Sequence, residues 1–170
     1  MTVEIRQLLG DDDRSEFKCG DETLDLFFHR YAGQNQFKHH IGVSYVAVEG
    51  DEILGFATVS MATLDADDLP SGRPMPPYPI PVLRIARLAT DLKAQGRGVG
   101  RALLRRVIEI AEDMRGEVGC VGILVDAKPD SISFYEPYGF VALDALEGEA
   151  QMVPRPTPMF VALGSVPRGK

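Results

Sequence analysis

The sequence has no tryptophan, only two cysteines and no long uninterrupted run of apolar residues. A membrane-spanning helix needs about 18 or more such residues in a row, so the sequence predicts no membrane span. Cys19 and Cys120 have no second cysteine or histidine at a metal-ligand spacing, which predicts free thiols and no metal site. Basic residues are also few, 18 against 25 acidic ones, and the net charge of −7 opposes long-range attraction to nucleic acid or anionic membranes.

The composition is that of an ordinary globular protein. The 170 residues are 45% hydrophobic and 25% charged, which predicts one domain spanning residues 1–170. The first residues, MTVEIRQLLGDDDR, are acidic and contain no apolar core of a secretory signal, so a cytoplasmic protein is expected.

Hydrophobic periodicity predicts an α/β fold. The expected order is a strand at 2–8, a helix beginning at Asp21, strands at 43–49 and 53–63, a proline-rich loop, a strand at 81–90, a helix from 100 that ends at Gly116, a strand at 120–127, a short helix at 130–138, and strands at 140–143 and 159–163. The almost continuously apolar residues 120–127 are typical of a parallel strand buried on both faces. We therefore expect a mixed central sheet with parallel middle strands, flanked by helices.

The residues Gln95-Gly96-Arg97-Gly98-Val99-Gly100-Arg101, here called the glycine loop (residues 95–101), lie between an expected strand and an expected helix. The first amides of a helix are unpaired and carry a partial positive charge, so they bind phosphate readily. Glycine lets phosphate oxygens approach several amides at once, and Arg97 and Arg101 add positive charge. The spacing matches neither the dinucleotide motif nor a Walker A loop. The alternative is a tight strand-to-helix turn without a ligand.

A family resemblance strengthens the phosphate interpretation. Residues 95–100 resemble the Q/R-x-x-G-x-G/A motif of the GNAT N-acetyltransferases, and Ser133-Phe134-Tyr135-Glu136-Pro137-Tyr138-Gly139-Phe140 resembles the FYxxxGF ending of that family. The resemblance implies a GNAT-like fold and acetyl-CoA as co-substrate, with no metal. It also implies which residues form the cofactor site: Leu88, Ala89, Thr90, Gln95, Gly96, Arg97, Gly98, Val99, Gly100, Arg101 and Ser131.

Acetyl transfer also needs a proton donor for the departing thiolate. The resemblance assigns this general-acid role to Tyr135, since a phenol with a pKa of about 10 is protonated at neutral pH. The alternative is a buried aromatic residue with no catalytic role. Lys128 stands where many family members carry Asn. No general base is identified; Asp91 is a base candidate or, as we expect, a turn residue.

The sequence PIPVLRIARLATD and the segment Phe17-Lys18-Cys19-Gly20 with the following Leu24–Phe27 resemble the GNAT toxins of bacterial toxin–antitoxin pairs. This branch acetylates the α-amine of aminoacyl-tRNA, which implies tRNA as acceptor and a ribbon-helix-helix antitoxin as partner; dimers are common among the relatives, so a homodimer is expected. An α-amine has a pKa of about 8, below that of the lysine side chain, so it loses its proton more easily and depends less on a general base. Two alternatives stay open: acetylation of a small amine or a protein amine, which suits an acidic protein, and a non-catalytic acyl-CoA-binding module.

Overall fold

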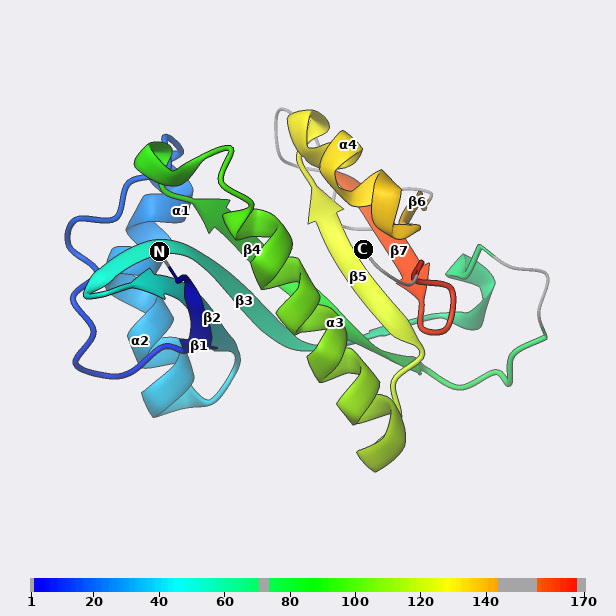
Figure 1. Cartoon of the computed structure of the whole chain (residues 1–170). Helices are drawn as coiled ribbons and strands as arrows, with labels where there is room; N and C mark the ends of the chain where they lie inside the picture. The colour runs from blue at the N-terminus through cyan, green and yellow to red at the C-terminus, as the bar shows by residue number, and fades with distance from the viewer. Residues whose placement is uncertain (1, 71–73, 144–155, 168–170) are drawn as a thin grey trace. The chain divides into compact units, whose positions relative to one another are not determined.

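The computed structural model describes residues 2–70, 74–143 and 156–167. Most of the connection between the predicted strands at 140–143 and 159–163 therefore lies outside the described residues. The main elements, in chain order, are β1 (Glu4–Gln7), α1 (Glu22–Leu26), α2 (Ala32–Gln34), β2 (Val43–Glu49), β3 (Glu52–Leu64), β4 (Ile80–Thr90), α3 (Val99–Glu117), β5 (Gly122–Ala127), α4 (Ile132–Tyr135), β6 (Val141–Ala142) and β7 (Thr157–Ala162). Figure 1 shows these elements along the chain.

The strands of the described residues form one sheet in the order β1-β2-β3-β4-β5-β7-β6. Neighbouring strands β4 and β5 run parallel, whereas the β1–β2, β2–β3, β5–β7 and β6–β7 pairs are antiparallel. The predicted α/β class, with a mixed sheet, parallel middle strands and flanking helices, is confirmed. The chain divides into two compact units, residues 1–60 with 85–109 and residues 61–84 with 110–170.

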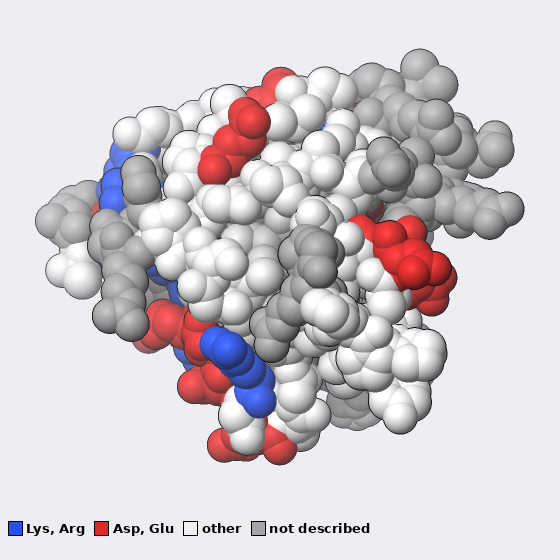
Figure 2. Space-filling model, turned by 90° about the vertical axis from the view of Figure 1, so that its right-hand side faces the viewer, with Lys and Arg blue, Asp and Glu red and all other residues white. Residues whose placement is uncertain are grey.

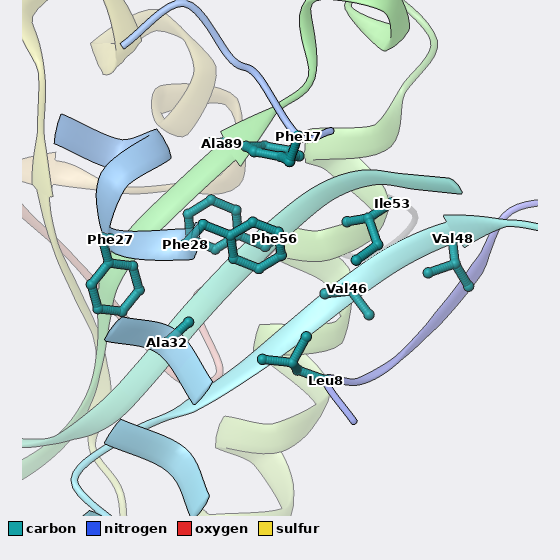
Figure 3. Close-up of a cluster of buried hydrophobic side chains, with 10 residues drawn as sticks. All are labelled: Leu8, Phe17, Phe27, Phe28, Ala32, Val46, Val48, Ile53, Phe56 and Ala89. Atoms are coloured by element: carbon teal, nitrogen blue, oxygen red, sulfur yellow. The ribbon is translucent and has the colours of Figure 1, made fainter. Parts of the chain in front are cut away.

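The first unit is built around a cluster of aromatic rings (Figure 3). Phe28 and Phe56 stack with their ring centroids 4.2 Å apart, and Phe17 contacts both rings edge-on. The cluster also buries Ala89, near the end of β4. It therefore fixes both the N-terminal segment at Phe17 and the strand that precedes the glycine loop. The predicted strands at 43–49 and 53–63 are confirmed and pair as the β2–β3 hairpin, with Gly50 at a positive φ of 62° in its turn.

The helical segment of this unit starts where the sequence predicts and runs further than it predicts. Asp21 caps α1 by accepting hydrogen bonds from the amides of Thr23 and Leu24. The polar residues after Gly33, for which no element was predicted, continue the helix as a π-helical turn, Asn35–His39. Gln36 explains this, because its buried amide group donates to Leu8 O and accepts from Ser44 N, at 3.2 and 2.8 Å, and so joins β1 to β2.

In the second unit, β5 packs closely against β7. A Cβ atom at Gly122 would collide with the Phe160 ring and with the carbonyl oxygen of Val161, so only glycine fits this strand position. We expect Gly122→Ala to lower the free energy of unfolding by about 3 kcal/mol, because the collision includes a backbone atom that cannot rotate away. Urea denaturation monitored by circular dichroism measures this.

Gly116 provides the matched control for that experiment. The sequence predicted that it ends α3, which is wrong: the helix continues to Glu117, and Gly119, with φ of 98°, makes the left-handed turn. A Cβ at Gly116 would meet no atom within 4 Å. Gly116→Ala should therefore raise the free energy of unfolding by about 0.5–1 kcal/mol. Equal effects at the two glycines would contradict this account of β5 packing.

Candidate functional site

The chain leaves β4 at Asp91 and enters the glycine loop through a short 3-10 turn, Leu92–Ala94. Gly96 and Gly98 both adopt positive φ, 82° and 81°. A side chain is strained in this conformation whatever space surrounds it, so the turn itself requires glycine at both positions. The predicted strand–loop–helix arrangement is thus confirmed.

The glycine loop is also open to solvent. A Cβ built at Gly96 or Gly98 meets no heavy atom within 4 Å, and Gln95, Arg97 and Arg101 are exposed. Protein packing therefore does not fill the space beside these glycines. A ligand can approach the backbone there, as the phosphate interpretation requires.

The start of α3 supplies amide groups to this space. The first backbone bond of the helix runs from Ala102 N to Gly98 O at 3.0 Å, so the N–H groups of Val99, Gly100 and Arg101 precede the intrahelical ladder. The helix is 19 residues long, and its aligned peptide dipoles place partial positive charge at this end. The geometry fits a diphosphate.

Gly55 on β3 fixes the helix start against the sheet. A Cβ at this position would lie 2.7 Å from Val99 Cγ1 and 3.0 Å from the carbonyl oxygen of Ala89. Any larger residue at Gly55 would push α3 away from the strand. The first turn of α3 and residues 88–90 of β4 are thereby held close together in one unit, as the predicted cofactor site requires.

Two cations near the loop have carboxylate neighbours on the β2–β3 hairpin. Arg97 Nη2 lies 2.8 Å from Glu49 Oε2, and Lys93 Nζ lies 3.8 Å from Glu52 Oε1. No local pattern predicts these pairs, because residues 49 and 52 are remote in the sequence from residues 93 and 97. Such partly exposed pairs contribute little stability, but they reduce the positive charge that Arg97 presents to an anion.

The remaining predicted site residues lie in the second unit. Tyr135 is the last residue of α4, and Ser131 precedes this helix without capping it through its side chain. Tyr135 is 4% exposed and contacts the rings of Phe134 and Phe140, with centroids 5.0 and 5.3 Å away. Burial raises the pKa of the Tyr135 hydroxyl, so the phenol keeps its proton at neutral pH.

The two arginines of β4 have local partners. Arg84 Nη2 donates to Asp126 Oδ2 at 2.6 Å in the second unit, and the Arg87 guanidinium lies 3.7 Å from the centroid of the Phe27 ring in the first. Within residues 2–70, 74–143 and 156–167, no group of three or more His, Cys, Asp or Glu side chains is placed to hold a metal ion. Nor does any helix in these ranges combine the length and apolarity of a membrane span.

Residues 3–140 match the model of the acetyltransferase (GNAT) family. The chain belongs to the GNAT acetyltransferase family. The resemblance drawn from the glycine loop and from residues 133–140 is thereby confirmed, as is the prediction of an acetyltransferase.

Individual relatives match the chain over most of its length. A tRNA-acetylating toxin of Mycobacterium tuberculosis is 32% identical over 139 residues, which cover 79% of this GNAT chain and 82% of the toxin. The solved structure of AtaT complexed with acetyl-methionyl-tRNAfMet matches with a TM-score of 0.83 and 26% identity, covering 96% of both chains. AtaTR bound with AcCoA matches with a TM-score of 0.78 and 26% identity, over 96% of this chain and 95% of that one.

Proposed function

We propose that this protein transfers the acetyl group of acetyl-CoA to the α-amine of aminoacyl-tRNA and thereby blocks translation. The observation that carries the proposal is the similarity to a tRNA-acetylating toxin over four-fifths of both chains, joined to an open glycine loop at the start of α3. The match to AtaT in complex with an acetylated aminoacyl-tRNA supports the acceptor, and the match to AtaTR with AcCoA supports the donor.

In this proposal the donor lies along the first unit. Main-chain amides of the glycine loop hold its diphosphate, except that of Arg97, whose N–H donates to Ala94 O at 3.3 Å. The backbone of Leu88, Ala89 and Thr90 pairs with the pantetheine arm as an added strand. A main-chain N–H of this strand polarises the acetyl carbonyl, an effect worth roughly 3–4 kcal/mol. Ser131 contributes a further contact from the segment before α4.

Tyr135 protonates the sulfur. The neutral α-amine attacks the thioester carbon, the C–N bond forms, the C–S bond breaks, and the Tyr135 hydroxyl gives its proton to the departing thiolate. The amine loses its extra proton to water, and Tyr135 regains one from solvent. Asp91 takes no part as a base, because its buried carboxylate accepts hydrogen bonds from the amides of Lys18 and Lys93.

This role predicts a particular alkaline pH profile. Because burial raises the pKa of Tyr135 above its ordinary value of about 10, its proton stays in place through that pH. We expect kcat to show no alkaline fall below about pH 10. The free energy of unfolding follows the same group. The contribution of the neutral Tyr135 phenol to it is present below about pH 10 and is lost as the pH rises through the higher folded-state pKa. An activity loss near pH 8 that Tyr135→Phe abolishes would contradict this.

Because the chain has a net charge of −7, binding of anionic tRNA requires positive charge near the site of contact. On the face drawn in Figure 2, the described residues show separate acidic and basic groups and no continuous basic surface. We expect contact with tRNA to use individual cations and the aminoacyl end, and the affinity should fall with salt in proportion to the number of phosphates contacted. A ribbon-helix-helix antitoxin and a homodimer remain part of the proposal.

Labelled acetyl transfer tests the acceptor directly. Acetyl-CoA carrying a labelled acetyl group is mixed with the protein and either aminoacylated tRNA, uncharged tRNA, or a panel of polyamines and lysine peptides. We expect label only on aminoacylated tRNA, released by mild alkaline hydrolysis as an N-acetyl amino acid. Label on a small amine or peptide and none on charged tRNA would overturn the proposed acceptor.

A further inference from the structure

The segment Phe17-Lys18-Cys19-Gly20 has no part in the chemistry above, yet the structure places it against the entrance of the glycine loop. Lys18 and the residues after β4 exchange hydrogen bonds in both directions. Lys18 N donates to Asp91 Oδ2 at 3.1 Å, and Leu92 N donates to Lys18 O at 2.9 Å. Two parts of the chain far apart in sequence are thus joined just before residue 95.

The Asp91 carboxylate is the centre of this contact. It is 4% exposed, and its other oxygen, Oδ1, accepts from Lys93 N at 3.0 Å. Its backbone N–H donates to Leu54 O on β3 at 2.8 Å. Both carboxylate oxygens therefore hold backbone amides, one from the N-terminal segment and one from the turn that leads into the glycine loop. Hydrogen bonds to a charged, buried acceptor are among the more costly to lose.

The N-terminal segment is itself fixed on both sides of Lys18. Phe17 is 3% exposed in the aromatic cluster, and Cys19 N donates to Asp25 Oδ1 at 2.9 Å. Gly20 has φ of 94°, and a Cβ there would lie 3.3 Å from Leu92 Cδ2. The segment is thus a rigid support for residues 91–94.

We infer that Asp91 is a positioning residue: it fixes the glycine loop to the N-terminal segment 17–20 and thereby sets the affinity for the diphosphate of the donor. This inference rests on the proposed function, because it assumes that the loop binds that diphosphate. Asp91 does not touch the donor. It acts by keeping the amides after residue 95 in place before the ligand arrives, which lowers the ordering cost of binding.

The test compares two acetyl donors. Acetyl-CoA carries the diphosphate, whereas S-acetyl-N-acetylcysteamine carries the same thioester without it. The measured quantity is the ratio of kcat/KM for the two donors, with the acceptor found in the transfer assay. For Asp91→Asn we expect this ratio to fall about tenfold through a higher KM for acetyl-CoA, because an amide group replaces one charged acceptor oxygen. The kcat at saturating acetyl-CoA should stay unchanged, which a general loss of structure would not allow.

Asp13→Asn is the matched control. Asp13 is exposed, and its carboxylate holds a local turn by accepting from Ser15 N at 3.0 Å and Ser15 Oγ at 2.6 Å. Its donor ratio should equal that of the unsubstituted protein. A ratio that falls equally in the Asp13 variant would overturn the inference, because the effect would then not depend on the contact with Lys18.

Gly20→Ala tests the same contact without changing Asp91. The added methyl strains the backbone and presses on Leu92, so the ratio should again fall. If Asp91→Asn does not fold, Gly20→Ala decides alone. An unchanged ratio in a folded variant overturns the inference and leaves the proposed function intact. If the unsubstituted protein shows no preference for acetyl-CoA, the proposed function of the loop fails first, and this inference fails with it.

Discussion

Tyr135→Phe lowers kcat for acetyl transfer by about 100-fold or more, while the Kd of acetyl-CoA changes little. The substitution removes only the hydroxyl that, in the proposed mechanism, protonates the thiolate. The ring keeps its edge contacts with Phe134 and Phe140, so the packing of α4 is preserved. Steady-state kinetics give kcat, and isothermal titration calorimetry gives the Kd of acetyl-CoA.

Tyr138→Phe is the control for that result. Tyr138 is 5% exposed, belongs to the same short helical segment and contacts the same Phe134 ring. Its substitution should leave kcat within about fivefold, since the loss of one uninvolved hydroxyl changes a free energy by only about 1 kcal/mol. Equal losses in the two variants would exclude a specific role for Tyr135. Full activity in Tyr135→Phe would contradict the mechanism.

We expect Gly98→Ala to weaken acetyl-CoA binding by about 100-fold, because at least two of the proposed hydrogen bonds between amides and diphosphate would be lost when the loop relaxes. The methyl group meets no protein atom within 4 Å, so the cost in folding stability comes only from the positive φ of 81°. That cost is roughly 1–2 kcal/mol. The variant should therefore fold and fail to bind, as calorimetry and urea denaturation can show together.

Gly50→Ala separates strain from binding. Gly50 also has a positive φ, 62°, and open space around its would-be Cβ, but it lies in the β2–β3 turn. We expect a similar loss of stability and an unchanged Kd for acetyl-CoA. A binding loss in Gly50→Ala as large as in Gly98→Ala would mean that backbone strain anywhere in this unit disturbs the site.

Local sequence signals were enough to predict the elements around the site. Alternating and continuous apolar runs predicted β2, β3, β4 and β5. A strand buried on one face alternates apolar and polar residues, and a strand buried on both faces is apolar throughout. The glycine loop was readable for a similar reason, since Gly96 and Gly98 occupy a conformation that other residues avoid. The role of Tyr135 came from a family resemblance and stays a prediction.

The contacts that support the site could not be read in the same way. Two of these contacts are the hydrogen bonds of Asp91 with Lys18 and of Arg97 with Glu49. Each joins residues that are far apart in the chain, and only the tertiary fold brings them together. The end of α3 was misplaced at Gly116 because a glycine inside an exposed helix costs little enough to be tolerated. The π-helical turn at Asn35–His39 depends on the buried amide of Gln36, which no local pattern indicates.

A structure of this protein in complex with acetyl-CoA would test the proposed diphosphate site most directly. We predict that the diphosphate oxygens accept hydrogen bonds from main-chain amides between Gly96 and Arg101, at the start of α3. A complex in which the diphosphate binds elsewhere, with those amides facing water, would contradict the account.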